Sequence, residues 1–183
     1  ALDIAGWDLF GKLRNKKLYE LWGGDISKNP LTDYTIGIDN IDTMVAKMKE
    51  KPWPIYKIKV GTSDDLGIVK ALREHTHAVL RVDANAAWDL ETALALIPKL
   101  KELGVELVEQ PLAKDNWEGM KVLYKESSLP LYADEACVEE EDVEKCKGHF
   151  HGINIKLTKC SGITPARGMI THACNAGLKV MIG

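Results

Sequence analysis

Short apolar runs alternate with stretches of helical periodicity along most of this chain. Apolar runs bounded by turn residues predict strands at 34–38, 55–60, 78–83, 105–109, 131–133, 153–157 and 178–182. Between them, apolar positions at helical spacing predict helices at 41–49, about 61–74, 89–103, 117–126, 139–147 and 164–176. Strict alternation of strands and helices is typical of a parallel sheet covered by helices.

Charged residues end five of these apolar runs at nearly even intervals. The runs IYKIK, VLRVD, VELVE, LYAD and INIK end at Lys59, Asp83, Glu109, Asp134 and Lys156, with spacings of 24, 26, 25 and 22 residues. A repeat of about 25 residues accommodates one strand, one helix and two short loops. We therefore expect the five side chains on one rim of one sheet. Each could instead be an ordinary loop residue beyond a strand end, but five in register disfavour that alternative.

The convergence of five groups favours a barrel over an open sheet. Neighbouring strands lie about 4.8 Å apart, so a flat sheet would spread the groups over tens of ångströms. A closed ring brings them to one axis, although a complete β/α barrel has eight strands and about 250 residues. We predict an α/β fold, an incomplete TIM-like (β/α) barrel of about seven parallel strands ringed by helices. Residues 1–183 are expected to form a single catalytic barrel domain, with leading helices and a linker in 1–33 and β/α units 1 to 7 in 34–183.

Composition narrows the class of protein. The 183 residues are 45% hydrophobic and 28% charged, which is typical of a globular domain. A net charge of −3 gives no reason to expect a nucleic-acid partner, and no apolar stretch approaches the roughly 20 residues of a membrane helix. The four cysteines lack CxxC spacing, and no secretory leader is evident. We expect a cytoplasmic protein with reduced thiols and neither a membrane nor a nucleic-acid partner.

Three of the five strand-end residues are carboxylates. Asp83, Glu109 and Asp134 would repel one another strongly without a cation between them. An oxygen-only ligand set suits a hard divalent ion, Mg²⁺ by default with Mn²⁺ as a possible substitute. The alternative is a solvated acidic patch. The sequence predicts a metal site.

Two lysines flank these carboxylates. Lys57 and Lys59 share one face of their strand, and Lys156 comes from a strand four units further along. A neighbouring like charge and partial desolvation favour the neutral amine that a general base needs. Two bases that face each other across a metal-bound carboxylate can remove a proton from one face of an α-carbon and return one to the other face. The expected intermediate is an enediolate, and the outcome is inversion of the stereocentre.

The chain carries the segments ALDIAGWDLFGK, TDYTIGID, YKIKVG, RVDANAAW, ELVEQPL, ADEAC and INIKLTKCSGI. In this combination it resembles the enolase superfamily, in its muconate-lactonizing-like subgroup, and most closely the dipeptide epimerases of the L-Ala-D/L-Glu type. The resemblance implies an isomerase: a Mg²⁺-dependent dipeptide epimerase that works by two-base 1,1-proton transfer on an Ala-Glu type dipeptide. Because an incomplete barrel leaves two strand edges unpaired, we also expect a homo-oligomer.

The resemblance implies four groups of site residues. They are the Mg²⁺ ligands Asp83, Glu109 and Asp134; the acid/base pair Lys59 and Lys156; the substrate contacts Thr35 and Lys57; and Asn85 and Lys159, which lie beside the catalytic groups. Members of this superfamily also carry an N-terminal capping domain and a further C-terminal barrel unit. We expect both segments to be absent from this chain.

Two alternatives stay open at this point. Within the same subgroup, o-succinylbenzoate synthase and muconate cycloisomerase would use the same two lysines and three acids. A non-catalytic fragment of such an enzyme would keep the core without the activity, because an open ring leaves two strand edges unpaired.

Overall fold

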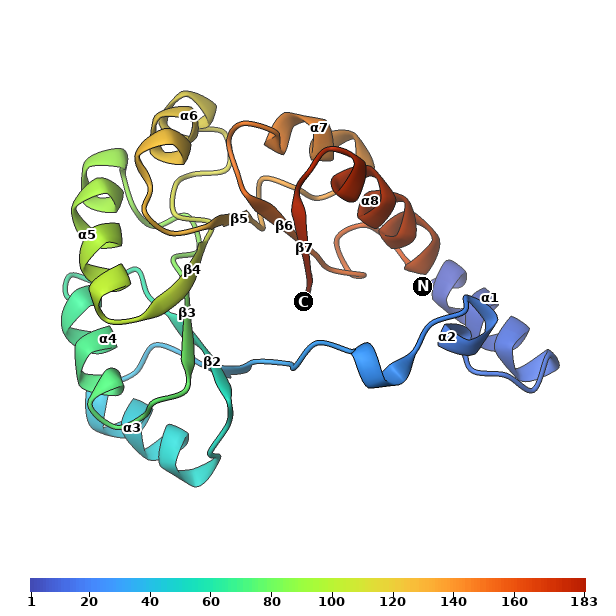
Figure 1. Cartoon of the computed structure of the whole chain (residues 1–183), viewed down its shortest axis with the longest axis horizontal. Coiled ribbons are helices and arrows are strands. Elements are labelled where there is room, and N and C mark those ends of the chain that lie inside the picture. Colours follow the sequence, from blue (N-terminus) through green and yellow to red (C-terminus); the bar gives the residue numbers. More distant parts are fainter.

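A single curved sheet organises the protein. The computed structural model describes all residues from Ala1 to Gly183. Its seven strands are all parallel and pair in sequence order, so β1 and β7 form the two edges of an open arc (Figure 1). The strands are β1 Tyr34–Ile36, β2 Ile55–Lys59, β3 Val79–Asp83, β4 Val105–Glu109, β5 Leu131–Ala133, β6 Gly152–Ile155 and β7 Lys179–Ile182. This arrangement confirms the predicted incomplete barrel.

The helices are α1 Leu2–Leu13, α2 Leu18–Leu21, α3 Ile41–Glu50, α4 Asp65–Arg73, α5 Leu90–Glu102, α6 Trp117–Glu126, α7 Val143–Cys146 and α8 Ile163–Asn175, with 3₁₀ turns η1 at Ile26–Lys28 and η2 at Glu140–Asp142. Helices α3 to α8 follow the strands and cover the convex side of the arc, whereas α1 and α2 precede β1 and lie next to α8 (Figure 1). None of these helices combines the length and the apolar character that crossing a membrane requires.

Four of the outer helices begin with the same kind of cap. A side-chain oxygen accepts the backbone N–H three residues later at 2.8–3.0 Å in the pairs Asn40–Thr43, Asp64–Gly67, Asp89–Thr92 and Asn116–Gly119. Such a cap contributes about 1 kcal/mol and fixes where a helix begins. Each loop that follows one of these strands therefore ends at a helix start that is fixed by its own capping residue.

The structure differs from the predicted elements in several places. Strand β6 ends at Ile155, so Lys156 lies in the turn that follows it, and α4 begins only at Asp65. Two further differences have local causes. The helix expected at 139–147 is divided into η2 and α7, because the Asp142 carboxylate accepts the N–H groups of Val138 and Glu139 at 3.1 and 3.3 Å and tightens the first turn. Strand β1 ends at Ile36, two residues early, and Ile38 is 52% exposed. There the chain has already turned toward the cap of α3 at Asn40.

The two faces of the sheet have different chemistry. The convex face buries apolar side chains against the helices, among them Ile58, Val82, Val108 and Ile153, all fully buried. Each contributes about 1.5–3 kcal/mol relative to an exposed side chain. The concave face carries the charged members of the strands, and a cavity of about 270 Å³ there has a mixed lining that includes Arg81 as well as Leu107. The polar members of the strands thus share the concave side with apolar side chains.

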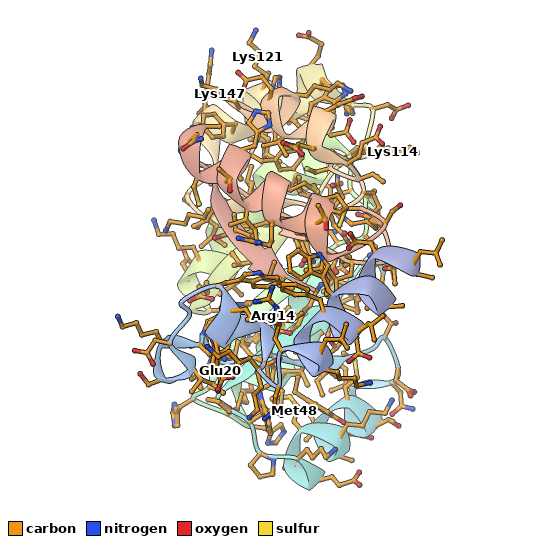
Figure 2. The ribbon with its side chains drawn as sticks, turned by 90° about the vertical axis from the view of Figure 1, so that its right-hand side faces the viewer. Arg14, Glu20, Met48, Lys114, Lys121 and Lys147 are labelled. Carbon is orange, nitrogen blue, oxygen red and sulfur yellow. The ribbon has the colours of Figure 1, made fainter.

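The leading helices are attached to α8. The Asp3 carboxylate accepts the N–H groups of Ile163 and Thr164, at the start of α8, at 2.6 and 2.9 Å. The indole N–H of Trp7 donates to the Thr164 hydroxyl at 2.7 Å. Figure 2 views the molecule from the side of this arm, on which Arg14 lies. Residues far apart in sequence therefore hold the turn that precedes α8.

Candidate active site

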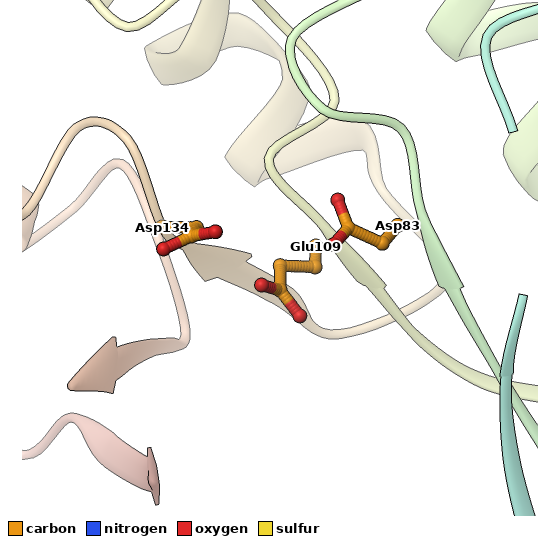
Figure 3. Close-up of side chains that lie close together, drawn as sticks. All are labelled: Asp83, Glu109 and Asp134. Atoms are coloured by element: carbon orange, nitrogen blue, oxygen red, sulfur yellow. The ribbon is translucent and has the colours of Figure 1, made fainter. Parts of the chain in front are cut away.

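Three buried carboxylates meet at the carboxyl ends of the central strands. Asp83 and Glu109 are the last residues of β3 and β4, and Asp134 directly follows β5. Asp83, Glu109 and Asp134 are 0%, 1% and 2% exposed, respectively. One carboxylate oxygen of each residue lies within 4.8 Å of those of the other two (Figure 3). The structure therefore brings together the three acids that the sequence placed on one rim.

This ligand set fits a hard divalent cation. Oxygens that bind one Mg²⁺ at about 2.0–2.1 Å lie at most about 4.2 Å apart, close to the separation found here. No sulfur or imidazole belongs to the group, so its chemistry matches Mg²⁺ or Mn²⁺ rather than zinc or copper.

One lysine bridges two of the carboxylates and a second binds one of them. The Lys57 amine lies 2.8 Å from both Asp83 and Glu109, and the Lys59 amine lies 2.6 Å from Asp83. Burial alone would lower the pKa of Lys57, but the charges of Glu109 and Asp83 outweigh it and raise that pKa above its usual range. Lys57 is thus a fixed cation. We call Lys57, Lys59 and Asp83 the Lys59 side of the site.

The opposite end of the group has a similar pair of amines. Lys156, which follows β6, forms an ion pair with Asp134. The Lys159 amine binds the other Asp134 oxygen at 2.6 Å and donates to the carbonyls of Asp134, Cys137 and Asn154 at 2.6–3.0 Å. Burial would raise the pKa of Asp134, but hydrogen bonds from Lys156 and Lys159 outweigh it and lower that pKa. We call Asp134, Lys156 and Lys159 the Lys156 side.

Glu109 lies between these two sides and differs from Asp134 in its electrostatics. Burial, reinforced by the nearby Asp83 charge, raises the pKa of Glu109 in spite of Lys57. Its other contact is Asn154, 1% exposed, whose side-chain N–H group donates to Glu109 at 2.8 Å. No role was predicted for Asn154 from the sequence. Its contact with Glu109 identifies it as a support for that carboxylate.

The sequence also missed Gln110 and Glu135. Gln110 is fully buried at a φ of +35°, which is unusual for a residue other than glycine, and its side-chain oxygen accepts the N–H groups of Asp134 and Ala136 at 3.0 and 3.1 Å. It thereby fixes the turn that carries Asp134. Glu135 accepts a hydrogen bond from Asn85 at 3.1 Å. Their positions could have indicated a role in the site, because each residue directly follows a strand-end acid.

The remaining predicted residues lie around this group. Asn85 accepts a hydrogen bond from Lys59 at 2.8 Å and thus lies beside a catalytic candidate, as predicted. Thr35 pairs in register with Lys57 and is exposed on the concave side of β1. The assignment of Thr35 and Lys57 as substrate contacts remains a prediction.

Comparison with known proteins matches the chain and its fold to one family. Residues 41–183 match the model of the family described as enolase C-terminal domain-like. The whole chain is 60% identical to an L-Ala-D/L-amino acid epimerase from Maribacter sp. and 56% identical to one from Flavobacterium johnsoniae, covering 54% of each. It superimposes with a TM-score of 0.93 and 38% identity on a dipeptide epimerase from Enterococcus faecalis V583 complexed with Mg and the dipeptide L-Leu-L-Tyr, covering all of this chain and 54% of that one.

The chain spans about half the length of the curated relatives that it matches. The match covers the whole of this chain, and so the stretch that contains the strand-end acids and lysines described above. The family match extends over most of the chain and all of the curved sheet after β1. These findings confirm the resemblance seen in the sequence, and the chain belongs to the enolase C-terminal domain-like family.

Proposed function

We propose that the protein is a Mg²⁺-dependent dipeptide epimerase that inverts the α-carbon next to the carboxylate of an L-Ala-containing dipeptide, Ala-Glu among them. The observation that carries this proposal is the placement of Lys59 and Lys156. Each forms an ion pair with a different candidate metal ligand, and the strands β2 and β6 that lead to them are separated by three strands of a curved sheet. Such a site presents one amine to each face of a bound substrate.

In this proposal Asp83, Glu109 and Asp134 hold the ion. A bound Mg²⁺ would supply a Lewis acid that stabilises the negative charge of the enediolate. The three acids are buried and close together, and the amines of the two sides already offset their charge. The names of the relatives, L-Ala-D/L-amino acid epimerase and a dipeptide epimerase complexed with Mg, agree with this assignment.

Proton transfer is assigned to the two more exposed amines. The side chains of Lys59 and Lys156 are 27% and 29% exposed, whereas those of Lys57 and Lys159 are 11% and 18% exposed. Lys57 carries the positive charge that Asp83 and Glu109 require, which leaves the Lys59 amine for proton transfer. One lysine removes the α-proton from one face, and the other delivers a proton to the opposite face. The net result is inversion without loss of atoms.

We also propose substrate contacts, a domain organisation, an oligomeric state and a cell compartment for the protein. We place Lys57 and Thr35 among the substrate contacts, and residues 34–183 in one catalytic barrel domain led by residues 1–33. We further propose a cytoplasmic homo-oligomer. Free cysteines support the reducing compartment, and the exposed side chains of Leu2 and Leu13 on α1 support a covered surface. Sedimentation of the full-length protein tests the oligomer.

The test of the activity is α-proton exchange. The full-length protein with Mg²⁺ should incorporate deuterium from D₂O at the second α-carbon of L-Ala-L-Glu and related L-Ala dipeptides, and should form the L,D diastereomer. Nuclear magnetic resonance follows both events at once. Failure to exchange any dipeptide, with activity instead on a cyclohexadienyl acid or a muconate lactone, would replace this function by one of the other reactions of the subgroup.

A further inference from the structure

The side-chain amide of Asn85 connects Lys59 to Glu135. The Lys59 amine donates to the Asn85 side-chain oxygen at 2.8 Å, and the Asn85 side-chain N–H group donates to Glu135 Oε1 at 3.1 Å. An ionised carboxylate can only accept hydrogen bonds, and the N–H groups of lysine require an acceptor. Only one orientation of the amide satisfies both neighbours. Glu135 and Lys59 therefore select the same orientation of the Asn85 amide, with its oxygen toward Lys59 and its N–H group toward Glu135.

The backbone holds this amide in an uncommon conformation. Asn85 has a φ of +44° and lies two residues beyond the end of β3, and its backbone N–H donates to Asp83 Oδ1 at 3.0 Å. Left-handed backbone at a residue other than glycine is uncommon and is concentrated at active sites and ligand clamps. The conformation places the amide between the loops that follow β2 and β5. A side chain so constrained can act as a spacer of fixed length.

Glu135 is itself placed at an energetic disadvantage. One carboxylate oxygen binds Asn85, and the other, Oε2, is buried without a hydrogen-bond partner in the protein. An unpaired buried carboxylate oxygen opposes folding, and an apolar side chain would remove that penalty. The Lys156 side has no equivalent device, since the Lys156 amine donates only to Asp134, whereas the Lys59 amine donates to Asn85 as well as to Asp83. The amide connection thus belongs to one side of the site only.

We propose that Glu135 is a positioning residue for Lys59 that acts through Asn85. By orienting the Asn85 amide, it holds the Lys59 amine in the position from which that lysine exchanges a proton with the substrate α-carbon. The inference rests on the proposed epimerase function and deepens it, because it makes proton transfer on one face depend on a residue that the other face does not use. This role requires a hydrogen-bond acceptor at position 135 for the Asn85 N–H group, and it does not require a negative charge.

The experiment measures deuterium exchange for each epimer of Ala-Glu separately in the full-length protein with saturating Mg²⁺. The Lys59-dependent epimer is the one whose exchange is lost in Lys59→Ala. Glu135→Leu and Glu135→Ala should slow exchange of that epimer about 10–100-fold, the usual effect of removing a residue that orients an active-site group through a hydrogen bond. The other epimer should exchange near its wild-type rate. Glu135→Gln should restore exchange, because its amide oxygen still accepts from Asn85.

A double-variant cycle and a control complete the test. Asn85→Leu should show the same one-sided loss, and adding Glu135→Leu to it should cause no further loss if Glu135 acts through Asn85. Glu141→Leu and Glu141→Gln, at an exposed position of the same connection, should change neither epimer. Equal slowing of both epimers by Glu135→Leu, or a shifted Mg²⁺ titration midpoint, would overturn the inference while leaving the epimerase function in place. A wild-type protein that exchanges neither epimer would instead remove the proposed function itself.

Discussion

On the Lys59 side both amines come from strand β2, two residues apart, and both bind Asp83. On the Lys156 side the amines are three residues apart in the turn that follows β6, and both bind Asp134. In each pair one amine is held by several acceptors and the other is more exposed. The comparison shows that two different backbone conformations can present the same arrangement, an anchored cation beside a more exposed one on a shared carboxylate.

The loops behind the two sides are held in different ways. After β2, Asp65 of α4 accepts the N–H groups of Gly61 and Thr62 at 2.7–3.0 Å and the Trp88 indole N–H at 2.7 Å, all within neighbouring units. After β6, the start of α8 is held by Asp3, which lies about 160 residues away in the chain. The Lys59 side therefore has local, buried support, and the Lys156 side depends on the docking of the leading helices.

Removal of the metal should erase the difference between the two sides. Chelation of Mg²⁺ from the full-length protein should slow exchange of both epimers by at least about 10³-fold, because the ion contributes several kcal/mol to stabilisation of the enediolate. Added Mg²⁺ should restore both rates together. Exchange of one epimer that persists after chelation would show that the two sides do not share an ion.

Substitution of the anchored lysine on each side, Lys57 or Lys159, should destabilise the protein to different extents. Lys57→Met leaves Asp83 and Glu109 facing each other without their bridging cation, and should cost about 3–5 kcal/mol of unfolding free energy in metal-free protein. Mg²⁺ should recover much of this loss by binding the native state. Thermal melts with and without Mg²⁺ measure both quantities.

Lys159→Met serves as the matched variant for that melt. It leaves Asp134 paired with Lys156, so its melting temperature should depend less on Mg²⁺ than that of Lys57→Met. An equal response to Mg²⁺ in the two variants would show that Lys57 does not compensate the charge of the carboxylates.

Of the two residues that cap these loops, the more buried one should contribute more to the unfolding free energy. Asp65→Ala removes the acceptor of several N–H groups, one from the buried Trp88, and should lower the unfolding free energy by about 2–4 kcal/mol. Asp3→Ala should lower it by less, because the contact lies at the surface. Denaturant unfolding at pH 7 compares the two, and a larger loss in Asp3→Ala would reverse the assignment of local and long-range support.

The smallest expected effect is the pH dependence of the Asp3 contact. Hydrogen bonds from Thr164 and Ile163 lower the pKa of Asp3 in the folded protein. Its contribution to stability is therefore complete above the ordinary aspartate pKa of about 3.9 and is lost as the pH falls through the lower folded value. The stability difference between wild type and Asp3→Asn should be constant at neutral pH and shrink in acid. A difference that grows on acidification would contradict the cap.

The sequence predicted the parts of the site that recur along the chain. Asp83, Glu109 and Asp134 end regularly spaced apolar runs, and parallel pairing necessarily places such ends on one rim. Gln110 and Glu135 were not predicted, because their partners lie 24 and 50 residues away in other loops and leave no periodic trace. Long-range hydrogen bonds between loops depend on the curvature of the arc and can be read only from the structure.

The shift of register between β3 and β4 is a further feature without a sequence signal. Leu80 pairs with Val105, but Val82 pairs with Val108, so one strand carries an extra residue. This irregularity coincides with the hydrogen bond from Arg81 to Glu106 at 2.6 Å below the carboxylates. The apolar run VELVE reads as a regular strand, because a bulge changes pairing without changing the hydrophobic pattern.

The central claim is that Lys59 and Lys156 act on opposite faces of one α-carbon. The most direct test is deuterium exchange of the two Ala-Glu epimers by the Lys59→Ala and Lys156→Ala variants of the full-length protein. Each variant should lose epimerisation and exchange of one epimer, yet still exchange the other, because the remaining lysine removes and returns the proton on its own face. Exchange of both epimers at equal rates in both variants would contradict opposed bases and reduce Lys156 to an electrostatic role.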